Sequence, residues 1–437
     1  MAEIVDRWNA AYFDGQLSPA VLAELGPLVD ASHDAQELAD RAFRFMRTAG
    51  IQATDVSELT AWMIGFSVPR TVPSAWSGAV PPVTMPGRHQ KLDEYIAGNP
   101  WHQPDGEGVF VDLGCGFPPF TTMDTARRLA DWRVVGVDPT FGQYMVYDTD
   151  GTYASFDDNY ELRYFQEGNY EPDPVATRAR FHSMLDRLLP QLPADADEVS
   201  DAEGRLVRDP VRQYQNGNLE LLPGGIGDLT LAGGADVVRC MNVFMYFDQP
   251  FRQRALDWVT DLLRPGGLFI SGSNWTQSAC SRYTVYRKET SGLVAREFAF
   301  SVENLRPIEL SPWYSLNDDE LDTLANAHAV GAVRADTEFR QRFDTRLDAL
   351  LAELRVCARG ADGYLGRPAA DVSTEDAALA SSVLATRLVD EGFADGAAEV
   401  LCQMGRKAWR NHVGHVAMEP VAPPPLDPSP VMAQRKS

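Results

Sequence analysis

The stretch Val109-Phe-Val-Asp-Leu-Gly-Cys-Gly-Phe-Pro-Pro119 decides the fold of this chain. Its apolar first half predicts a buried strand, and the strand runs directly into a turn that contains two glycines. A second apolar stretch, Val134-Val-Gly-Val-Asp138, ends in an acid. Strands that end in this way are typical of an open α/β sheet, which binds its ligand at the carboxyl ends of its strands.

The turn and the acid together indicate a nucleoside ligand. Glycine has no side chain, so Gly114 and Gly116 let the backbone turn sharply and approach a ligand closely. Asp138 follows the turn by roughly the 20 residues expected for an acid that accepts hydrogen bonds from ribose hydroxyls. The expected cofactor contacts are therefore the acid Asp138 and the turn residues Asp112, Gly114, Cys115 and Gly116.

The prolines after the turn narrow the choice of cofactor. A dinucleotide fingerprint needs a glycine at position 119, but this chain has Pro118-Pro119. Two prolines also remove backbone N–H donors that a phosphate would use. A cofactor without phosphate fits better, and the Asp-Leu-Gly-Cys-Gly turn resembles the first motif of the class I methyltransferases, which use S-adenosylmethionine. In this resemblance the usual third glycine is Pro118.

Composition excludes several other classes of protein. A net charge of −23 over 437 residues repels nucleic-acid phosphates, so no nucleic-acid partner is expected. The first residues carry acids and no long apolar stretch, which predicts a cytoplasmic protein without a signal peptide or a membrane span. The five cysteines are scattered without a C-x-x-C pair, so neither a disulfide framework nor a metal site is expected.

The pattern along the chain predicts four regions: a helical amino-terminal region or lid (1–104), an α/β domain (105–312), a helical carboxyl-terminal region (313–418) and a disordered tail (419–437). The apolar runs place strands of the α/β domain at 108–113, 133–137, 214–220, 235–241 and 267–273. A long insert, 139–213, is rich in tyrosine and phenylalanine, and we expect it to cap the active site. The proline-rich segment around residues 68–86 is expected to form a wall or lid.

A second motif follows the predicted strand 235–241. Cys240-Met-Asn-Val-Phe-Met-Tyr-Phe-Asp248 resembles the signature of the CheR-type protein-glutamate methyltransferases, whose typical run is Cys-Arg-Asn-Val followed by Tyr-Phe. The pair Asn218-Leu219 matches an upstream Asn-Leu of that family. The family's arginine is Met241 here, although Arg239 lies two positions earlier. The resemblance covers roughly residues 108–275.

The resemblance implies a fold and a set of site residues. It implies a Rossmann-like methyltransferase sheet, mostly parallel, with seven strands of which one is antiparallel, flanked by the helical ends. It places Asn218, Leu219 and Asn242 at the cofactor, and Tyr246, Asn242 and Arg239 at the methyl-transfer centre. No histidine lies in the two motifs, and His182, His412 and His415 lie elsewhere. The absence of a nearby base favours an acceptor that is already ionised, such as a carboxylate.

Three functions remain open on the sequence. The leading one is S-adenosylmethionine-dependent O-methylation of a carboxylate or hydroxyl on a small-molecule natural product, a peptide or a protein side chain. Met241 keeps a second hypothesis open, a catalytically inactive S-adenosylmethionine-binding sensor. The third, a NAD-dependent oxidoreductase, is disfavoured by Pro119. The acceptor and the oligomeric state are not specified by the sequence.

Overall fold

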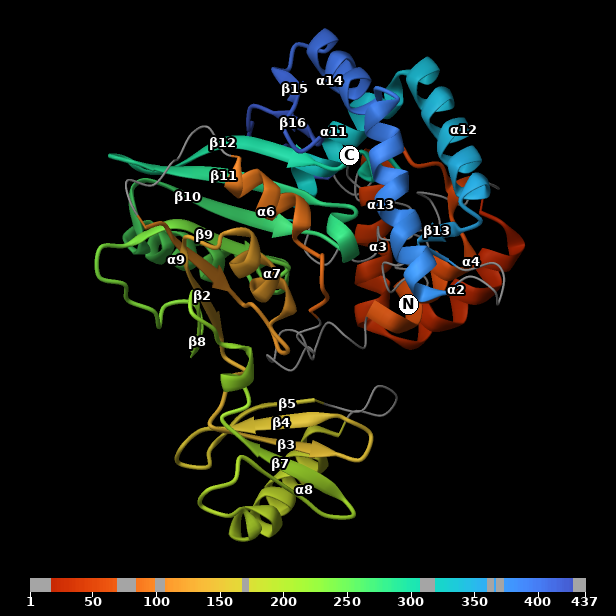
Figure 1. The fold of residues 1–437 in the computed structure, drawn as a ribbon. Coiled ribbons are helices and arrows are strands. Elements are labelled where there is room, and N and C mark those ends of the chain that lie inside the picture. Colours follow the sequence, from red (N-terminus) through yellow and green to blue (C-terminus); the bar gives the residue numbers. More distant parts are fainter. Residues whose placement is uncertain are drawn as a thin grey trace.

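The computed structural model describes residues 17–68, 84–98, 107–166, 173–306, 319–359, 365–366 and 373–426. Within them lie a large central sheet, a smaller sheet at one end of the molecule, and a group of helices at the other (Figure 1). Most of the predicted proline-rich lid (69–83) and the end of the predicted tail (427–437) lie outside the described residues. Among the described helices, none is both long and apolar enough to span a membrane.

Five parallel strands form the core of the central sheet. Their order in space is β8 (Leu219–Pro223), β2 (Arg133–Asp138), β1 (Val109–Leu113), β9 (Ala235–Met241) and β10 (Leu263–Ser273). Helices α6 (Gln90–Ala97) and α7 (Phe120–Arg128) share a hydrophobic core with one face, and α9 (Gln249–Leu262) shares another core with the opposite face. This is the doubly wound arrangement of a Rossmann-like sheet.

Four further strands continue the sheet beyond β10, and each pairs antiparallel with its neighbour. They are β11 (Arg282–Glu289), β12 (Gly292–Phe300), β16 (Val416–Met418) and β15 (Ala408–Arg410). The Rossmann-like fold is confirmed, but the sheet has nine strands instead of seven, and two of them, β11 and β16, run against the parallel core. The last two strands come from a segment in which we expected helices, because three-residue strands carry too little periodicity to be recognised.

The insert after β2 is a small unit of its own. Its strands lie in the order β5-β4-β3-β7-β6, with bounds Leu162–Phe165, Tyr153–Phe156, Tyr144–Asp148, Gly204–Arg208 and Glu198–Ser200. Helix α8 (Pro174–Leu188) shares a hydrophobic core with this sheet. Other insert residues, Met145, Tyr153 and Tyr164, belong to the core that also contains Phe117 of the turn after β1. The insert therefore adjoins that turn through an aromatic surface, while its body projects away from the central sheet (Figure 1).

The helices at the two ends of the described chain pack together. The amino-terminal helices are α2 (Pro19–Ala31), α3 (His33–Thr48) and α4 (Glu58–Trp62); the carboxyl-terminal ones are α11 (Leu321–Ala335), α12 (Thr337–Glu353), α13 (Thr374–Asp390) and α14 (Phe393–Gln403). Residues of both groups belong to one hydrophobic core, which also takes in Phe298 and Phe300 of β12. A short hairpin, β13 (Cys357–Arg359) and β14 (Leu365–Gly366), completes the described strands. The two predicted helical regions thus share one core.

Candidate functional site

The turn after β1 has the conformation that its glycines predict. Gly114 and Gly116 have φ angles of 71° and 73°, in the left-handed region that favours glycine. The amide of Gly114 donates to the carbonyl oxygen of Val137 at 2.8 Å, and that of Gly116 donates to the Asp138 carboxylate at 2.7 Å. The turn is therefore fastened to the end of β2, and the expected acid stands beside it.

Asp138 is an enclosed hydrogen-bond acceptor. Its carboxylate also accepts from the backbone amide and the hydroxyl of Thr140, and only 3% of the residue is exposed. Burial raises the pKa of this carboxyl, against the hydrogen bonds from Thr140 and Gly116 that lower it. The ring of Phe117 contacts those of Phe141 and Tyr153, so aromatic residues enclose this end of the sheet.

The loop after β9 brings the second motif to the same turn. A methyl group of Val243 lies so close to Gly114 that an added Cβ would approach it to 2.6 Å. The preceding residue, Asn242, has a φ of 61°, and its amide donates to the carbonyl oxygen of Gly272 in β10. Gly114 is therefore required at this position, because any side chain would displace the loop of the second motif.

Two asparagines join the ends of β9 and β10. Asn274 donates its backbone amide to the side-chain oxygen of Asn242 at 3.0 Å, and the Asn242 amide donates back to the Asn274 side-chain oxygen at 3.3 Å. The remaining amide group of Asn274 donates to the carbonyl oxygen of Arg88 and lies 2.9 Å from Nδ1 of His89. Asn242 therefore reaches the expected edge of the sheet and is held there by Asn274, which in turn binds the loop that begins α6.

His89 is a buried residue of this edge that our reading of the sequence missed. Since an amide nitrogen can only donate, the imidazole accepts at Nδ1 and carries its proton on Nε2. Burial lowers the pKa of His89 well below its usual value, and the charges of Arg239 and Arg88 lower it further. The ring is neutral at pH 7. His89 lies outside both motifs, between the proline-rich segment that ends at Pro86 and the helix that begins at Gln90, so no motif pointed to it.

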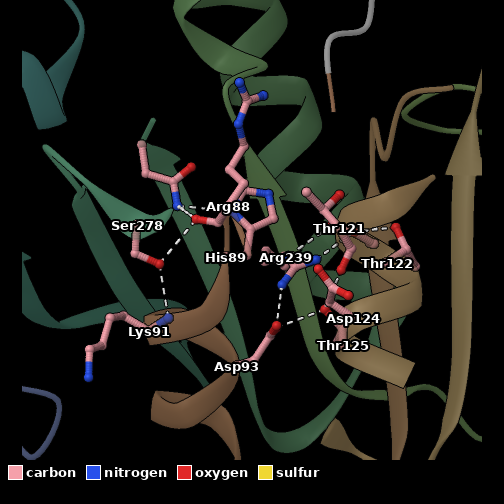
Figure 2. Close-up of polar contacts among 12 residues, drawn as sticks. Arg88, His89, Lys91, Asp93, Thr121, Thr122, Asp124, Thr125, Arg239 and Ser278 are labelled. Atoms are coloured by element: carbon pink, nitrogen blue, oxygen red, sulfur yellow. Dashed lines mark hydrogen bonds and ion pairs between the residues drawn. The ribbon is translucent and has the colours of Figure 1, made fainter. Parts of the chain in front are cut away.

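Arg239 forms a buried ion-pair network (Figure 2). Its guanidinium group donates to Asp112 of β1 at 2.6 and 3.0 Å and to Asp93 of α6 at 2.7 Å, and its side chain is fully buried. Thr122 and Thr125 of α7 donate to the same two carboxylates. Burial raises the pKa of Asp93 to about 6, although Arg239 and Thr125 lower it.

This network gives two of the predicted site residues a structural partner. Arg239 was expected at the acceptor and Asp112 at the cofactor, and their side chains bind each other across neighbouring strands, in register, so both roles stay predictions. The side chain of Cys115 likewise packs in the core, where burial raises the pKa of its thiol well above the usual value. The buried side chains of Arg239, Asp112 and Cys115 therefore stabilise the strands and the turn that form the candidate site.

The structure places Asn218 and Leu219 away from Asp138, so their contact with the cofactor stays a prediction that the geometry does not favour. The predicted strand 214–220 begins only at Leu219, so Asn218 lies at the amino end of β8, opposite the edge that holds Asp138. The Asn218 amide donates to the carbonyl oxygens of Ala126, Leu129 and Trp132, at the end of α7. Leu219 is buried in the core.

Tyr246 lies at the expected edge, in the short helix η5 (Phe244–Tyr246) that follows the second motif. It packs with Met245 against Leu38 of α3 and Val68. Burial raises the pKa of its hydroxyl, while the nearby charge of Arg88 lowers it. The hydroxyl is therefore protonated at neutral pH and able to donate.

Comparison with known proteins finds local similarity. No family model matches the chain. A segment of 45 residues is 47% identical to chemotaxis protein methyltransferase 2 of Pseudomonas aeruginosa, and 60 residues are 40% identical to the chemotaxis protein methyltransferase of Klebsiella aerogenes. The segments are 10% and 14% of this chain, and the chain spans only 16% and 21% of those relatives. The resemblance to CheR-type enzymes is confirmed over these short segments.

Solved structures of low overall similarity include two methyltransferases. One is the plantazolicin methyltransferase BpumL in complex with SAH, at 10% identity and a TM-score of 0.24 over 55% of this chain and 62% of that one. The other is the glycopeptide N-methyltransferase MtfA complexed with S-adenosyl-L-methionine, at 15% identity and a TM-score of 0.22 over 49% and 69%.

Proposed function

We propose that this chain is an S-adenosylmethionine-dependent methyltransferase that methylates an oxygen, preferentially a carboxylate, of a small-molecule or peptide acceptor. The observation that carries the proposal is the contact of Val243 with Gly114, because it joins the glycine turn to the CheR-like loop at one edge of the sheet. Ligands bind at this edge in open α/β sheets.

The residues present fit the cofactor in their chemistry. Asp138 supplies a carboxylate that now accepts from the Thr140 hydroxyl, and ribose hydroxyls are donors of the same kind. Gly114 and Gly116 adopt the left-handed backbone that forms this tight turn beside Asp138. In this proposal Asp138 and the turn hold the nucleoside, and the insert's aromatic surface beside Phe117 covers it.

The other groups at this edge would orient the acceptor. The protonated hydroxyl of Tyr246 would donate to an acceptor oxygen, and the Asn242–Asn274 pair would hold the loop between the two ligands. The chemistry that S-adenosylmethionine supplies is a methyl group on a sulfonium, which the acceptor oxygen takes as a new O–C bond while the S–C electron pair returns to sulfur. Proximity provides much of the acceleration in such a reaction, provided that water is kept out.

The protonation state of His89 favours an anionic acceptor. A neutral imidazole with a strongly lowered pKa is a weak base, so it is poorly suited to deprotonate a hydroxyl at pH 7. A carboxylate needs no base. The choice of a carboxylate over a hydroxyl follows from this argument.

Calorimetric titration with S-adenosylmethionine and S-adenosylhomocysteine, with NADH as the control, tests the cofactor. We expect micromolar binding of both adenosyl ligands and none of NADH; the reverse pattern would restore the oxidoreductase hypothesis. Transfer of a labelled methyl group to a panel of carboxylates then separates enzyme from sensor. A protein that binds the cofactor but transfers no methyl group to any carboxylate or hydroxyl would be a sensor.

A further inference from the structure

A cavity of about 640 Å³ lies at the same edge of the sheet as the candidate site. Five segments line it: the start of α6, the short helices η6 (Thr276–Ser278) and η7 (Val302–Leu305), helix α13, and the turn between β15 and β16. Because β12 runs in the direction of β10 and Phe300 pairs with Val416, η7 and the β15–β16 turn both lie where the parallel strands end. This volume suits a small molecule.

One loop separates the cavity from the candidate site. Asn274 and Ser278 both donate to the carbonyl oxygen of Arg88, and the amide of Lys91 donates to the Ser278 hydroxyl (Figure 2). His89 on this loop faces the asparagine pair, whereas Lys91 and Ser278 line the cavity. From β9 to β12 are three strand spacings, or about 14 Å. An elongated molecule could therefore occupy both places.

The backbone of η6 is strained where it lines the cavity. Gln277 and Ser278 have φ angles of 54° and 58°, which residues with a side chain rarely adopt. Such conformations persist where the surroundings impose them, and they gather at ligand sites. The strain supports a binding role for the cavity.

The charge that the lining leaves for a ligand is negative. Its basic residues Lys91 and Arg410 already form ion pairs with Glu94 and Asp395, which do not line the cavity. His415 is neutral at pH 7, because burial and the charges of Lys91 and His412 lower its pKa to about 3. Asp390 has no ion-pair partner in the part of the chain that the structure describes.

We propose that this cavity binds the ammonium group of an elongated small-molecule acceptor, whose methylated oxygen lies beside Asn242 and Asn274. The position of the methylated oxygen rests on the proposed function, whereas the ammonium site in the cavity does not. The net charge of −23 on the whole chain also favours a positively charged ligand.

Three probes with the same six-carbon chain test the cavity: 1,6-diaminohexane, 1,6-hexanediol and adipate. Binding to the full chain is measured at low salt by ligand-observed NMR. We expect the diamine to bind about tenfold more tightly than the diol, as charge-assisted hydrogen bonds allow, and adipate not to bind. Replacing the exposed carboxylate, Asp390→Asn, should weaken the diamine about threefold. The matched control is Asp257→Asn, an exposed acid on α9, which should change nothing.

The proposal is overturned if adipate binds as well as the diamine, if none of the three probes binds, or if Asp390→Asn has no effect. Titration of the same proteins with S-adenosylhomocysteine separates this proposal from the proposed function. Cofactor binding without diamine binding would reject the cavity alone. Diamine binding without cofactor binding would reject the methyltransferase and leave the cavity as a cation site, without the link to an acceptor.

Discussion

Asp138 both closes the turn after β1 and presents the acceptor group on which the proposed cofactor site depends. Its carboxylate is bonded to the Gly116 amide and to Thr140, so the acid is already oriented before any ligand arrives. Orientation of this kind lowers the entropy cost of binding. At the scale of single residues, the question is which polar groups serve a ligand and which serve the fold.

Replacement of Asp138 tests whether this residue binds the cofactor. We expect Asp138→Ala to weaken binding of S-adenosylhomocysteine by about 1 to 3 kcal/mol, the usual cost of losing a hydrogen bond to a charged group. Calorimetry measures the change, and Asp131→Ala, an exposed acid just before β2, is the matched control. Equal affinities of the two variants would exclude Asp138 from the site.

Replacement of Arg239 tests whether this residue stabilises the fold. Arg239→Met leaves Asp93 and Asp112 buried without their cation, so we expect a loss of about 3 to 5 kcal/mol in the free energy of unfolding, measured with urea. The exposed Arg254→Met provides the control. A variant that stays stable but loses methyl transfer alone would return Arg239 to the catalytic role first expected from the sequence.

His415 predicts a pH dependence of stability. Its pKa is lowered to about 3 in the folded chain, chiefly by burial, so the unfolded chain alone takes up the proton below about pH 6.5. The stabilisation is therefore full above pH 6.5 and is lost as the pH falls toward 3, with a slope of up to about 1.4 kcal/mol per pH unit. Urea unfolding of His415→Gln between pH 6 and 4 should show a shallower slope than the parent chain. His33→Gln, on an exposed side chain of α3, is the matched control.

At the scale of elements, local patterns could be predicted and distant pairings could not. Strands β1, β2 and β9 lie where their apolar runs placed them, because a buried strand needs only its own residues to be recognised. By contrast, β16 pairs with β12 across more than a hundred residues and in turn pairs with β15, and no local pattern records the distant pairing. The same limit applies to the residues of the candidate site. The spacing from the glycine turn predicts Asp138, whereas His89 lies outside both motifs and no local pattern predicts it.

The contacts of Asn218 at the end of α7 give a structural alternative to its family role. Asn218 matched a family pair, yet its amide donates to three carbonyl oxygens at the end of this helix. We expect Asn218→Ala to lower the free energy of unfolding by about 1 to 3 kcal/mol, because those carbonyls lose their donor. Affinity for S-adenosylhomocysteine should not change. A variant with normal stability but weakened cofactor binding would instead support the family role.

At the scale of the whole molecule, the described chain contains cores that are separated in space. One joins the amino- and carboxyl-terminal helices to β12, and another lies between α8 and the sheet of the insert. Segments that share a core tend to unfold together, whereas separate cores can open independently. The ends of the chain should therefore behave as one unit, although they are far apart in sequence.

Two fully buried phenylalanines, one in each core, make this testable. Phe43→Ala removes a side chain of α3 from the core of the terminal helices, at a cost of about 3 to 5 kcal/mol. Hydrogen exchange should then become faster not only in α3 but also in α11 and α14, while α8 keeps its protection. Phe181→Ala in α8 should give the opposite pattern. If Phe43→Ala left α11 and α14 fully protected, the two ends of the chain would be separate units.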